Sequence, residues 1–336
     1  MQRFAQIIGV GGYLPTHVVT NADLEQLVDT SDEWIVSRTG IRERRFVAEG
    51  ETTSDLAERA ARVAMDRAGV GADDVDLLLV GTSSPDHIMP STACRTQHKL
   101  GLACPAVDLM AACSSFIYAL QYGAAAIESG RADTVLVVGA EALTRLIDFT
   151  DRSTCVLFGD GAGAVVLRAG DVSGVEAIVL GADGSGGDHL VVPAGGATYP
   201  VTAAAVDSHD HFLKMNGSEV FKFAVRVIPR ATQEALTASG HSVADLRWLV
   251  PHQANERIIT TVEERLGIED ERVYLNLAAT GNTSAASIPL ALDDLYTSGR
   301  LAPGDLLALV GFGAGLTWGA AVVTWTMAPP EKEALS

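Results

Sequence analysis

The segment Ser129-Gly-Arg-Ala-Asp-Thr-Val-Leu-Val-Val-Gly139 returns in altered form as Ser298-Gly-Arg-Leu-Ala-Pro-Gly-Asp-Leu-Leu-Ala-Leu-Val-Gly311. Both versions run from Ser-Gly-Arg, which is typical of the end of a helix, into a short apolar stretch that closes on glycine. Residues 77–80 form a third apolar stretch of this kind. Short, uniformly apolar stretches are typical of strands buried on both faces of a sheet. The recurrence therefore predicts an α/β fold.

The recurrence also covers residues upstream of these two segments. Asp76-Leu-Leu-Leu-Val-Gly81 and Asp245-Leu-Arg-Trp-Leu-Val250 open the two copies, and a polar turn and a helical pattern follow each of them. Chance similarity is the alternative explanation, because strand-turn-helix units are common. We interpret the pattern as an internal duplication. It divides the chain into an N-terminal half, 1–172, and a C-terminal half, 173–328, before a tail, 329–336, that we expect to be frayed.

The composition disfavours several classes of protein. The 336 residues carry a formal net charge of −18, which argues against nucleic acid as a partner and against docking on an anionic membrane. The sequence holds no run of about 18 apolar residues, so we expect no membrane span. The N-terminus is expected to form a first strand and not a signal peptide. Four cysteines without CxxC spacing indicate reduced thiols and a cytoplasmic location.

Three polar residues lie at predicted strand-to-helix turns of the duplicated unit. Cys113 and Asn282 each precede the matching serines, Ser129 and Ser298, by 16 residues, so we expect them to occupy equivalent turns. His252 follows the predicted strand that opens the second copy. Ligands of open α/β sheets collect at the carboxyl ends of strands, where such turns lie. These three residues are therefore candidates for a common site.

Cys113 is the candidate nucleophile. It lies in Asp108-Leu-Met-Ala-Ala-Cys-Ser-Ser-Phe116, where a turn of small residues precedes a predicted helix. The partial positive charge of a helix N-terminus favours thiolate over thiol, and thiolate is the reactive form. The alternative is that Cys113 is a small buried apolar residue, which is the commonest fate of a free cysteine. Cys94, Cys104 and Cys155 lack this setting, and we interpret them as core or turn residues.

Six segments together resemble the β-ketoacyl-[acyl-carrier-protein] synthase III family, in the expected order and over roughly residues 4–325. The segments are Asp29-Thr-Ser-Asp-Glu-Trp-Ile-Val-Ser-Arg-Thr-Gly-Ile-Arg-Glu-Arg44, Ala112-Cys113, Phe158-Gly-Asp-Gly-Ala-Gly163, Val250-Pro-His-Gln-Ala-Asn255, Thr280-Gly-Asn-Thr-Ser-Ala-Ala-Ser-Ile-Pro289 and Gly311-Phe-Gly-Ala-Gly-Leu-Thr-Trp-Gly319. The resemblance implies a thiolase-like fold with five layers, α-β-α-β-α, two pseudo-symmetric halves, and a homodimer.

The resemblance also implies a reaction, the condensation of a short acyl-coenzyme A primer with malonyl-[acyl carrier protein]. Cys113 would hold the acyl group, and His252 and Asn282 would donate hydrogen bonds to the enolate oxygen formed on decarboxylation. The N–H groups of Cys113 and Ala314 would form an oxyanion hole, and Phe312 would shield the sulfur. Coenzyme A and the carrier are substrates, so we expect no cofactor and no metal ion.

The substrate contacts expected from the resemblance come from several segments. Coenzyme A would meet an aromatic face and two arginines, and its pantetheine arm would run past a helix start to the sulfur. The expected residues are Thr30, Trp34, Arg38, Arg152, Gly217, Phe221 and Asn255, with Phe312 beside the sulfur. Met89 is expected to reach the acyl pocket of the partner subunit.

Acyl carrier protein is acidic, as this chain is, so its docking requires a local basic cluster. The expected carrier contacts are Lys222, Arg226, Gln253 and Arg257, with Arg230 and Arg265 as further candidates. The sequence departs from the family pattern at Glu256, Ser115 and Ala314. Solvated helix faces are the alternative interpretation of these arginines.

Other functions stay open at this stage. A relative that primes a polyketide pathway, or one that transfers the acyl group to a hydroxyl or amine, would share most of these motifs. A non-catalytic acyl-thioester binding protein would also retain the fold. His252 alone could be a structural histidine, and Gly-Asn-Thr-Ser alone could be a turn and helix cap. We interpret Gly159-Asp-Gly-Ala-Gly163 as close packing at a turn, and His209 and His211 as solvated loop residues.

Overall fold

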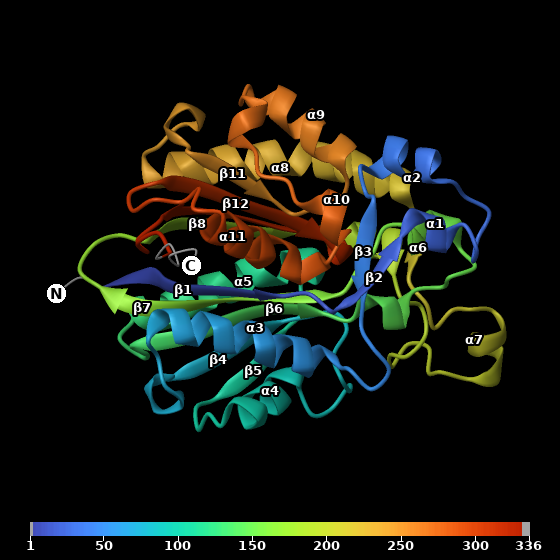
Figure 1. Ribbon diagram of the computed structural model, residues 1–336, viewed down its shortest axis with the longest axis horizontal. Helices are drawn as coiled ribbons and strands as arrows, with labels where there is room; N and C mark the ends of the chain where they lie inside the picture. Colours follow the sequence, from blue (N-terminus) through green and yellow to red (C-terminus); the bar gives the residue numbers. More distant parts are fainter. Residues whose placement is uncertain (1–2, 331–336) are drawn as a thin grey trace, which may run out of the picture.

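The computed structural model describes residues 3–330, whose strands form two mixed sheets stacked on each other (Figure 1). The first sheet has the order β1-β7-β6-β4-β5 and the second has the order β11-β12-β13-β8. The first contains β1 (Phe4–Tyr13), β4 (Leu77–Gly81), β5 (Ala106–Leu109), β6 (Thr134–Glu141) and β7 (Gly161–Gly170). The second contains β8 (Val175–Ala182), β11 (Trp248–Pro251), β12 (Leu306–Gly313) and β13 (Thr317–Thr324).

The two sheets repeat one pairing pattern. In the first, β6 runs parallel to β4 and antiparallel to β7, which pairs antiparallel with β1. In the second, β12 runs parallel to β11 and antiparallel to β13, which pairs antiparallel with β8. The counterpart of β5 is reduced to a single parallel bridge between Leu249 and Val273. The duplicated architecture expected from the sequence is confirmed, and β7 ends and β8 begins on either side of the expected boundary at 172.

Helices complete five layers, α-β-α-β-α, as predicted (Figure 1). Two helices lie between the sheets, α5 (Ser115–Glu128) and α11 (Ser287–Thr297). The outer layers are α3 (Thr53–Ala68) with α4 (Thr92–Leu100), and α8 (Gly217–Ser239) with α9 (Glu256–Leu266). No helix within residues 3–330 combines the length and apolar character needed to cross a bilayer.

The central strands are apolar throughout because each of their faces meets a different core. On β6, Val135 and Val137 belong to the core between the sheets, while Leu136 and Val138 belong to the core under α3 and α4. Alternate residues of a strand point to opposite faces, so a strand with two buried faces needs apolar residues at every position. The same division holds along β12, which explains why both apolar stretches recur in the sequence.

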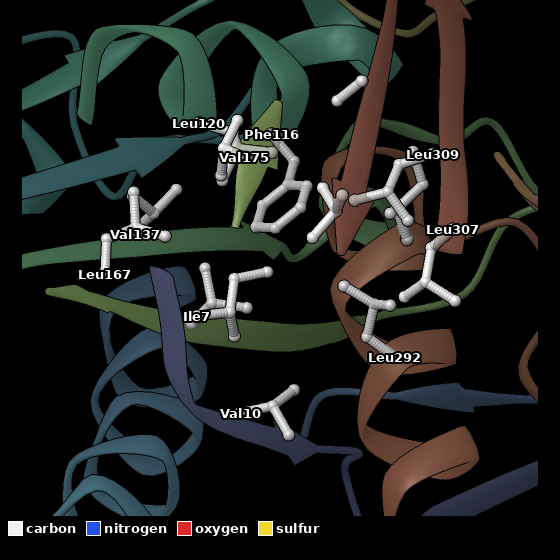
Figure 2. Close-up of a cluster of buried hydrophobic side chains, with 14 of the residues drawn as sticks. Ile7, Val10, Phe116, Leu120, Val137, Leu167, Val175, Leu292, Leu307 and Leu309 are labelled. Atoms are coloured by element: carbon white, nitrogen blue, oxygen red, sulfur yellow. The ribbon is translucent and has the colours of Figure 1, made fainter. Parts of the chain in front are cut away.

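The core between the sheets joins the two halves. Figure 2 shows Phe116 and Leu120 of α5 among side chains of both sheets, including Val137 and Leu309. Phe116, Leu120 and Leu292 of α11 are completely buried. Because both central helices are covered on all sides, neither half can hide its apolar surface without the other.

The smaller elements gather at one end of the layers, on the right of Figure 1. They are α1 (Asn21–Leu24), α2 (Asp32–Thr39), α6 (Arg152–Cys155), α7 (Ala203–Asp207), α10 (Leu277–Thr280) and the short strands β2 (His17–Thr20), β3 (Glu43–Phe46), β9 (Leu190–Val191) and β10 (Lys214–Met215). β9 and β10 pair antiparallel, and the segment between them contains α7. Of the tail 329–336, residues 331–336 lie outside the described part.

One expectation about the duplication is wrong. Single 3-10 turns, Ala112–Ser114 and Ser284–Ala286, lead into α5 and α11, so Cys113 corresponds to Ala285 and not to Asn282. The difference arises because α5 has 14 residues and α11 has 11, one helical turn fewer. Residues counted back from the helix ends are therefore displaced by three.

Candidate active site

Ser115, the first residue of α5, forms hydrogen bonds that stabilise the turn carrying Cys113. Ala112 has φ of 49°, in the left-handed region that is unfavourable for a residue with a side chain. Ser115 Oγ donates to the Ala112 carbonyl at 2.7 Å and accepts from the Ala111 N–H at 2.8 Å. These bonds stabilise the strained turn, which gives a structural reason for serine at this departure from the family pattern.

The end of β12 packs directly on this turn. A Cβ atom at Gly313 would lie 2.5 Å from the backbone nitrogen of Cys113, and one at Gly311 would lie 3.3 Å from its carbonyl oxygen. Glycine therefore lets the C-terminal sheet approach the sulfur-bearing turn of the N-terminal half. Phe312, between these glycines, is buried, and its ring centroid lies 5.4 Å from that of His252. Phe312 packs in the core under α8 and α9 beside His252, on the face of β12 opposite to the Cys113 turn.

The Cys113 thiol is protonated at rest, contrary to the expectation from the helix N-terminus. Burial raises its pKa to about 12, the Ser284 side chain opposes this rise, and the negative charge of Glu141 adds to it. The reason is that removing a thiolate from water costs more free energy than its interaction with the N-terminus of α5 recovers. We therefore expect the thiol form of Cys113 to predominate in the resting chain.

His252 follows β11 and is neutral. Burial lowers its pKa to about 3. Its Nδ1 lies 2.7 Å from Ser287 Oγ, and Ser287 Oγ accepts the Gln253 N–H at 3.4 Å. Since that hydroxyl has one hydrogen, we assign it to Nδ1, which leaves the imidazole proton on Nε2. This tautomer makes His252 a neutral hydrogen-bond donor.

Asn282 is held by backbone groups of both halves. Its N–H donates to the Leu157 carbonyl at 2.8 Å, and its own carbonyl accepts the Gly159 N–H at 3.0 Å. Its side-chain Oδ1 accepts the backbone N–H of Ser284 at 2.9 Å. Because the amide oxygen is engaged, the Nδ2 hydrogens are directed to other acceptors. Asn282 is therefore a second neutral donor with a fixed orientation.

The three candidate residues are brought into one buried region. Cys113, His252 and Asn282 are 8%, 2% and 6% exposed. Phe312 and Ser287 contact His252, while Ser284, on the same turn as Ser287, anchors Asn282. Turns from both halves therefore gather at the carboxyl ends of the central strands, and a common site for the three residues stays a prediction.

A cavity of about 930 Å³ opens beside Cys113. Its wall is mainly apolar and combines both halves with the segment around β9. The lining includes Ser83, Ser84, Pro85, Ile88, Met110, Cys113, Leu143, Leu146, Phe158, Leu190, Val191, Val192, Val201, Leu213, Ser284, Ala314 and Thr317. Ala314 thus lies on the same cavity as Cys113, where its N–H was expected. An apolar cavity that meets a nucleophile suits an acyl chain.

The residues expected to meet coenzyme A lie together on α2 and α6. The guanidinium carbons of Arg38 and Arg152 lie 5.8 and 4.8 Å from the Trp34 ring centroid. Arg152 also donates to the Asp29 carbonyl at 2.9 Å, beside Thr30. Two arginines over an indole form a cationic, aromatic surface that fits a nucleotide with phosphates. This cluster supports the expected coenzyme A contact.

The remaining expected substrate residues are placed differently. Gly217 is exposed at the start of α8, and Phe221 packs against the core under α8 and α9. Asn255 caps α9 through the Arg257 N–H and donates to the Arg38 carbonyl at 3.0 Å, so both ends of its amide have partners. None of these three lines the cavity beside Cys113. Met89 is 85% exposed, and its neighbour Ile88 lines the cavity.

The expected carrier surface is only partly available. The side chain of Gln253 is completely buried and donates to the Pro251 and Tyr274 carbonyls, so its assignment to a docking surface is wrong. Gln253 stabilises the turn of His252 instead. Lys222 pairs with Glu219 at 2.7 Å. Arg226 and Arg257 are exposed, as expected.

The further candidate arginines are exposed but already have partners within the chain. Arg230 approaches Glu234 at 3.5 Å and lies over the Trp318 ring, and Arg265 donates to a backbone carbonyl of α8. Glu256, a departure from the family pattern, packs over Gly40 between α2 and α9. A cleft of about 380 Å³ between these helices is lined by Glu256 and Arg257. Glu256 therefore joins two helices and places a carboxylate beside Arg257.

Three residues of this region were not expected from the sequence, and a fourth, His209, has a different environment than expected. Ser287 and Ser284 lie inside the quoted asparagine motif but were not singled out, and Glu141 ends an apolar stretch. A charged residue that closes a buried strand is a signal that could have drawn attention to Glu141. His209 is not simply solvated, because its Nδ1 lies 2.6 Å from a carboxylate oxygen of Asp148.

Relatives of known family match nearly the whole chain. The sequence model of the 3-oxoacyl-[acyl-carrier-protein (ACP)] synthase III family matches residues 107–184, and that of its C-terminal part matches 236–325. A model described as stage V sporulation protein AD matches 38–145. The β-ketoacyl-[acyl-carrier-protein] synthase III of Xanthomonas axonopodis pv. citri is 50% identical over 323 residues, 96% of this chain and 98% of the relative.

This chain belongs to the β-ketoacyl-[acyl-carrier-protein] synthase III family. This synthase III is therefore a condensing enzyme of the acyltransferase class. The 3-oxoacyl-[acyl-carrier-protein] synthase III of Aquifex aeolicus VF5 superposes with a TM-score of 0.88 at 43% identity, covering 96% of this chain and all of the relative. The priming β-ketosynthase of the R1128 polyketide pathway superposes with a TM-score of 0.91 at 39% identity, covering 98% of each chain. The thiolase-like fold is thus confirmed.

Proposed function

We propose that this synthase III joins a short acyl-coenzyme A primer to malonyl-[acyl carrier protein] and so initiates fatty acid chains. We assign the catalytic roles to these residues because hydrogen bonds fix the orientation of both the His252 and the Asn282 side chain. Ser287 engages Nδ1 of the imidazole, and the Ser284 N–H engages Oδ1 of the amide. Two neutral donors remain for the oxygen on which negative charge develops.

In the first step, Cys113 takes the acyl group from coenzyme A. The sulfur attacks the thioester carbon, the carbon–sulfur bond to coenzyme A breaks, and the thiol proton ends on the leaving thiolate. The N–H groups of Cys113 and Ala314 would hold the oxyanion of the tetrahedral intermediate. Trp34, Arg38 and Arg152 would bind the nucleotide end of coenzyme A.

In the second step, the malonyl thioester loses carbon dioxide and becomes an enolate. His252 Nε2–H and Asn282 Nδ2–H would donate to its oxygen, where they act most strongly in the transition state. The enolate carbon attacks the acyl carbon on Cys113, and the sulfur leaves and takes up a proton. The products are 3-oxoacyl-[acyl carrier protein], carbon dioxide and coenzyme A, so the chemistry requires no cofactor.

The proposed assembly is a homodimer that binds carrier protein near Arg226 and Arg257. Ile88, Met89 and Met110 are exposed apolar residues, and two of them line the cavity beside Cys113. Exposed apolar residues at the rim of a substrate cavity favour cover by a second copy of the chain. We place Met89 there as a contributor to the partner subunit's acyl pocket. The reducing cytoplasm expected from the free thiols stays a prediction.

The proposal is tested by separating the two steps. Incubation with acetyl-coenzyme A should add one acetyl group to Cys113 in the intact protein mass. Asn282→Ala should retain this adduct but lose carbon dioxide release from malonyl carrier protein by about 10²–10³-fold, as expected for one lost oxyanion donor. A wild-type chain without the adduct would instead indicate a non-catalytic binding protein.

Priming of a polyketide pathway is a second candidate function. The similarity to the R1128 priming ketosynthase favours it, because that relative aligns over 98% of both chains. The two functions share every residue assigned above and differ in primer and carrier. Carbon dioxide release with a panel of acyl-coenzyme A primers and carriers distinguishes them.

A further inference from the structure

Glu141 is a completely buried carboxylate that the proposed reaction does not use. It is the last residue of β6, at the carboxyl end of the first sheet, and it is 0% exposed. Burial raises its pKa, while hydrogen bonds with Ser84, Ser83 and Ser284 oppose this effect. A buried carboxyl group is costly unless hydrogen bonds satisfy it, so its partners indicate its role.

The partners of Glu141 come from both halves of the chain. Ser84 donates to Oε2 through its N–H at 3.0 Å and its hydroxyl at 2.6 Å, and the Ser83 N–H donates at 3.1 Å. Thr82 Oγ1 adds a longer bond of 3.3 Å. From the C-terminal half, Ser284 Oγ donates to Oε1 at 2.9 Å. One carboxylate therefore ties the loop after β4 to the turn that follows Asn282.

The pair of Glu141 and Ser284 breaks an otherwise repeated arrangement. Gly139 and Gly311 hold equivalent places on β6 and β12, and each packs against the equivalent turn of the opposite half, at Ala285 and Cys113. Two residues further along β12, on the same face of the strand, Gly313 packs against Ala112, and this contact is van der Waals packing without a hydrogen bond from a side chain. The corresponding contact in the other half is the hydrogen bond between Glu141 and Ser284. At this strand position the polar link is thus made from β6 by Glu141, whereas the Cys113 turn is hydrogen-bonded to the other half through Thr317 of β13.

Ser284 transmits this link to the Asn282 side chain. Its φ of 48° places a residue with a side chain in the left-handed region, so its conformation needs support from neighbours. In that conformation its N–H donates to Asn282 Oδ1 at 2.9 Å. Without the bond from Ser284 Oγ to Glu141, the turn can relax, and the amide of Asn282 loses its fixed orientation.

We propose that Glu141 is a positioning residue that fixes Asn282 through Ser284 and thereby supports decarboxylation of the malonyl thioester. This inference rests on the proposed function of the site. Glu141 touches neither substrate nor sulfur, and it acts by holding an amide within hydrogen-bond reach of the enolate oxygen. Acyl transfer to Cys113 does not need that amide. The two half-reactions should therefore respond differently to changes at Glu141.

Glu141→Gln tests the proposal, because it keeps the side-chain shape but turns one acceptor oxygen into a donor facing other donors. We expect carbon dioxide release from malonyl carrier protein to fall by about 10–100-fold, part of the loss typical of a missing oxyanion donor. Acetylation of Cys113, followed by intact mass over time, should stay within about threefold of wild type or rise, since the negative charge of Glu141 raises the pKa of that thiol.

Two further variants locate the effect. Ser284→Ala removes the bond to Glu141 but keeps the N–H that serves Asn282, so it should lose carbon dioxide release as Glu141→Gln does. Because the same hydroxyl opposes the rise in the Cys113 pKa, acetylation of Cys113 should also slow in this variant, and carbon dioxide release is therefore measured on the chain already acetylated. Thr82→Val removes the longest bond to the same carboxylate together with a bond from the Ser84 N–H, but it leaves the bond between Glu141 and Ser284 in place, so the ratio of the two half-reactions should stay unchanged. Because Glu141 acts through Asn282, Glu141→Gln should add no further loss to Asn282→Ala.

Several results would overturn the proposal. A parallel fall of both half-reactions in Glu141→Gln would show a general structural role, as would an additive loss in the double variant with Asn282→Ala. Normal carbon dioxide release in Glu141→Gln would remove its role altogether. If Glu141→Gln does not fold, Ser284→Ala alone decides, because it deletes a single oxygen. Failure of the proposed function is recognised separately, since the wild-type chain would then show neither half-reaction.

Discussion

His252 and Asn282 are oriented by hydroxyl and backbone groups and not by charges. Ser287 faces one nitrogen of the imidazole, and the Ser284 N–H holds the oxygen of the amide. Neutral partners keep both donors uncharged, which suits stabilisation of an enolate in a buried site. A nearby cation would bind the enolate and also its carboxylate precursor, and so would gain less in the transition state.

The burial of His252 predicts a dependence of stability on pH. Its pKa is lowered to about 3 in the folded chain, while an unfolded histidine titrates near 6.5. Between these values the unfolded state binds more protons, so the free energy of unfolding should fall as pH drops below about 6.5, by up to about 1.4 kcal/mol per pH unit. Denaturant unfolding of wild type and His252→Gln between pH 7.5 and 4.5 measures the difference.

The expected result is a smaller loss of stability on acidification in His252→Gln than in wild type. His17→Gln, at an exposed position of β2, serves as the control and should follow the wild-type profile. Parallel profiles for wild type and His252→Gln would show that this histidine gains its proton without unfolding. The proposed neutral donor would then have to be revised.

The sequence was sufficient to propose Cys113, His252 and Asn282 as candidates, because reactive residue types at strand-to-helix turns are a local signal. It was insufficient for Glu141, whose partners come from the loop after β4 and from Ser284, 143 residues away. It also overstated the effect of the helix start on Cys113. Burial of the thiol depends on the packing of both halves, which no single segment encodes.

At the scale of elements, glycines at the ends of the two central strands set the distance between the halves. A Cβ atom on Gly139 would lie 2.2 Å from the Ala285 carbonyl oxygen. No side chain at that place can avoid the turn between Asn282 and α11, because the obstacle is backbone. β6 can therefore reach the asparagine turn only with glycine at this position.

Gly139→Ala should accordingly displace the asparagine turn. We expect the free energy of unfolding to fall by about 1–3 kcal/mol, as is usual when an interior is overpacked, and carbon dioxide release to fall more than acetylation of Cys113. Gly184→Ala, where a Cβ atom meets nothing within 4 Å, is the matched control. Equal stability of Gly139→Ala and wild type in denaturant unfolding would contradict the close approach.

The elements themselves were largely predictable, but their relative register was not. The apolar stretches predicted β4, β6 and β12, and the helical patterns predicted α5 and α11. These predictions succeeded because the environment of the side chains repeats regularly along each of these elements. The equivalence of Cys113 with Asn282 failed because α11 is one turn shorter than α5. A spacing counted from helix ends carries no information about helix length, so the structure was needed to pair Cys113 with Ala285.

At the scale of the whole molecule, the two halves share one interior. Phe116 of α5 lies among side chains of both sheets, and α11 completes the same layer (Figure 2). β3 of the N-terminal half also approaches α10 of the C-terminal half, and the backbone N–H of Arg42, just before β3, donates to the Ala278 carbonyl at 2.9 Å. The division of the sequence at 172 did not predict this second contact. The residue pattern of a short strand does not indicate which distant segment the strand will contact.

The shared interior predicts that both halves unfold together. Phe116→Ala should lower the free energy of unfolding by about 3–5 kcal/mol, because it removes a buried aromatic ring and leaves a cavity. Calorimetry should show one transition for the wild type and for this variant, displaced to lower temperature. Two separate transitions would mean that the halves are independent folding units, against the arrangement of α5 and α11.

The protonated state of Cys113 has a consequence for selective chemistry at this protein. Peroxide and small alkylating reagents react with thiolates, so a buried thiol with a pKa of about 12 should resist both in the resting chain. Reaction then requires a molecule that occupies the apolar cavity and delivers its electrophile to the sulfur. A covalent inhibitor should therefore gain its potency from an alkyl tail matched to the cavity, and a highly reactive warhead should add little.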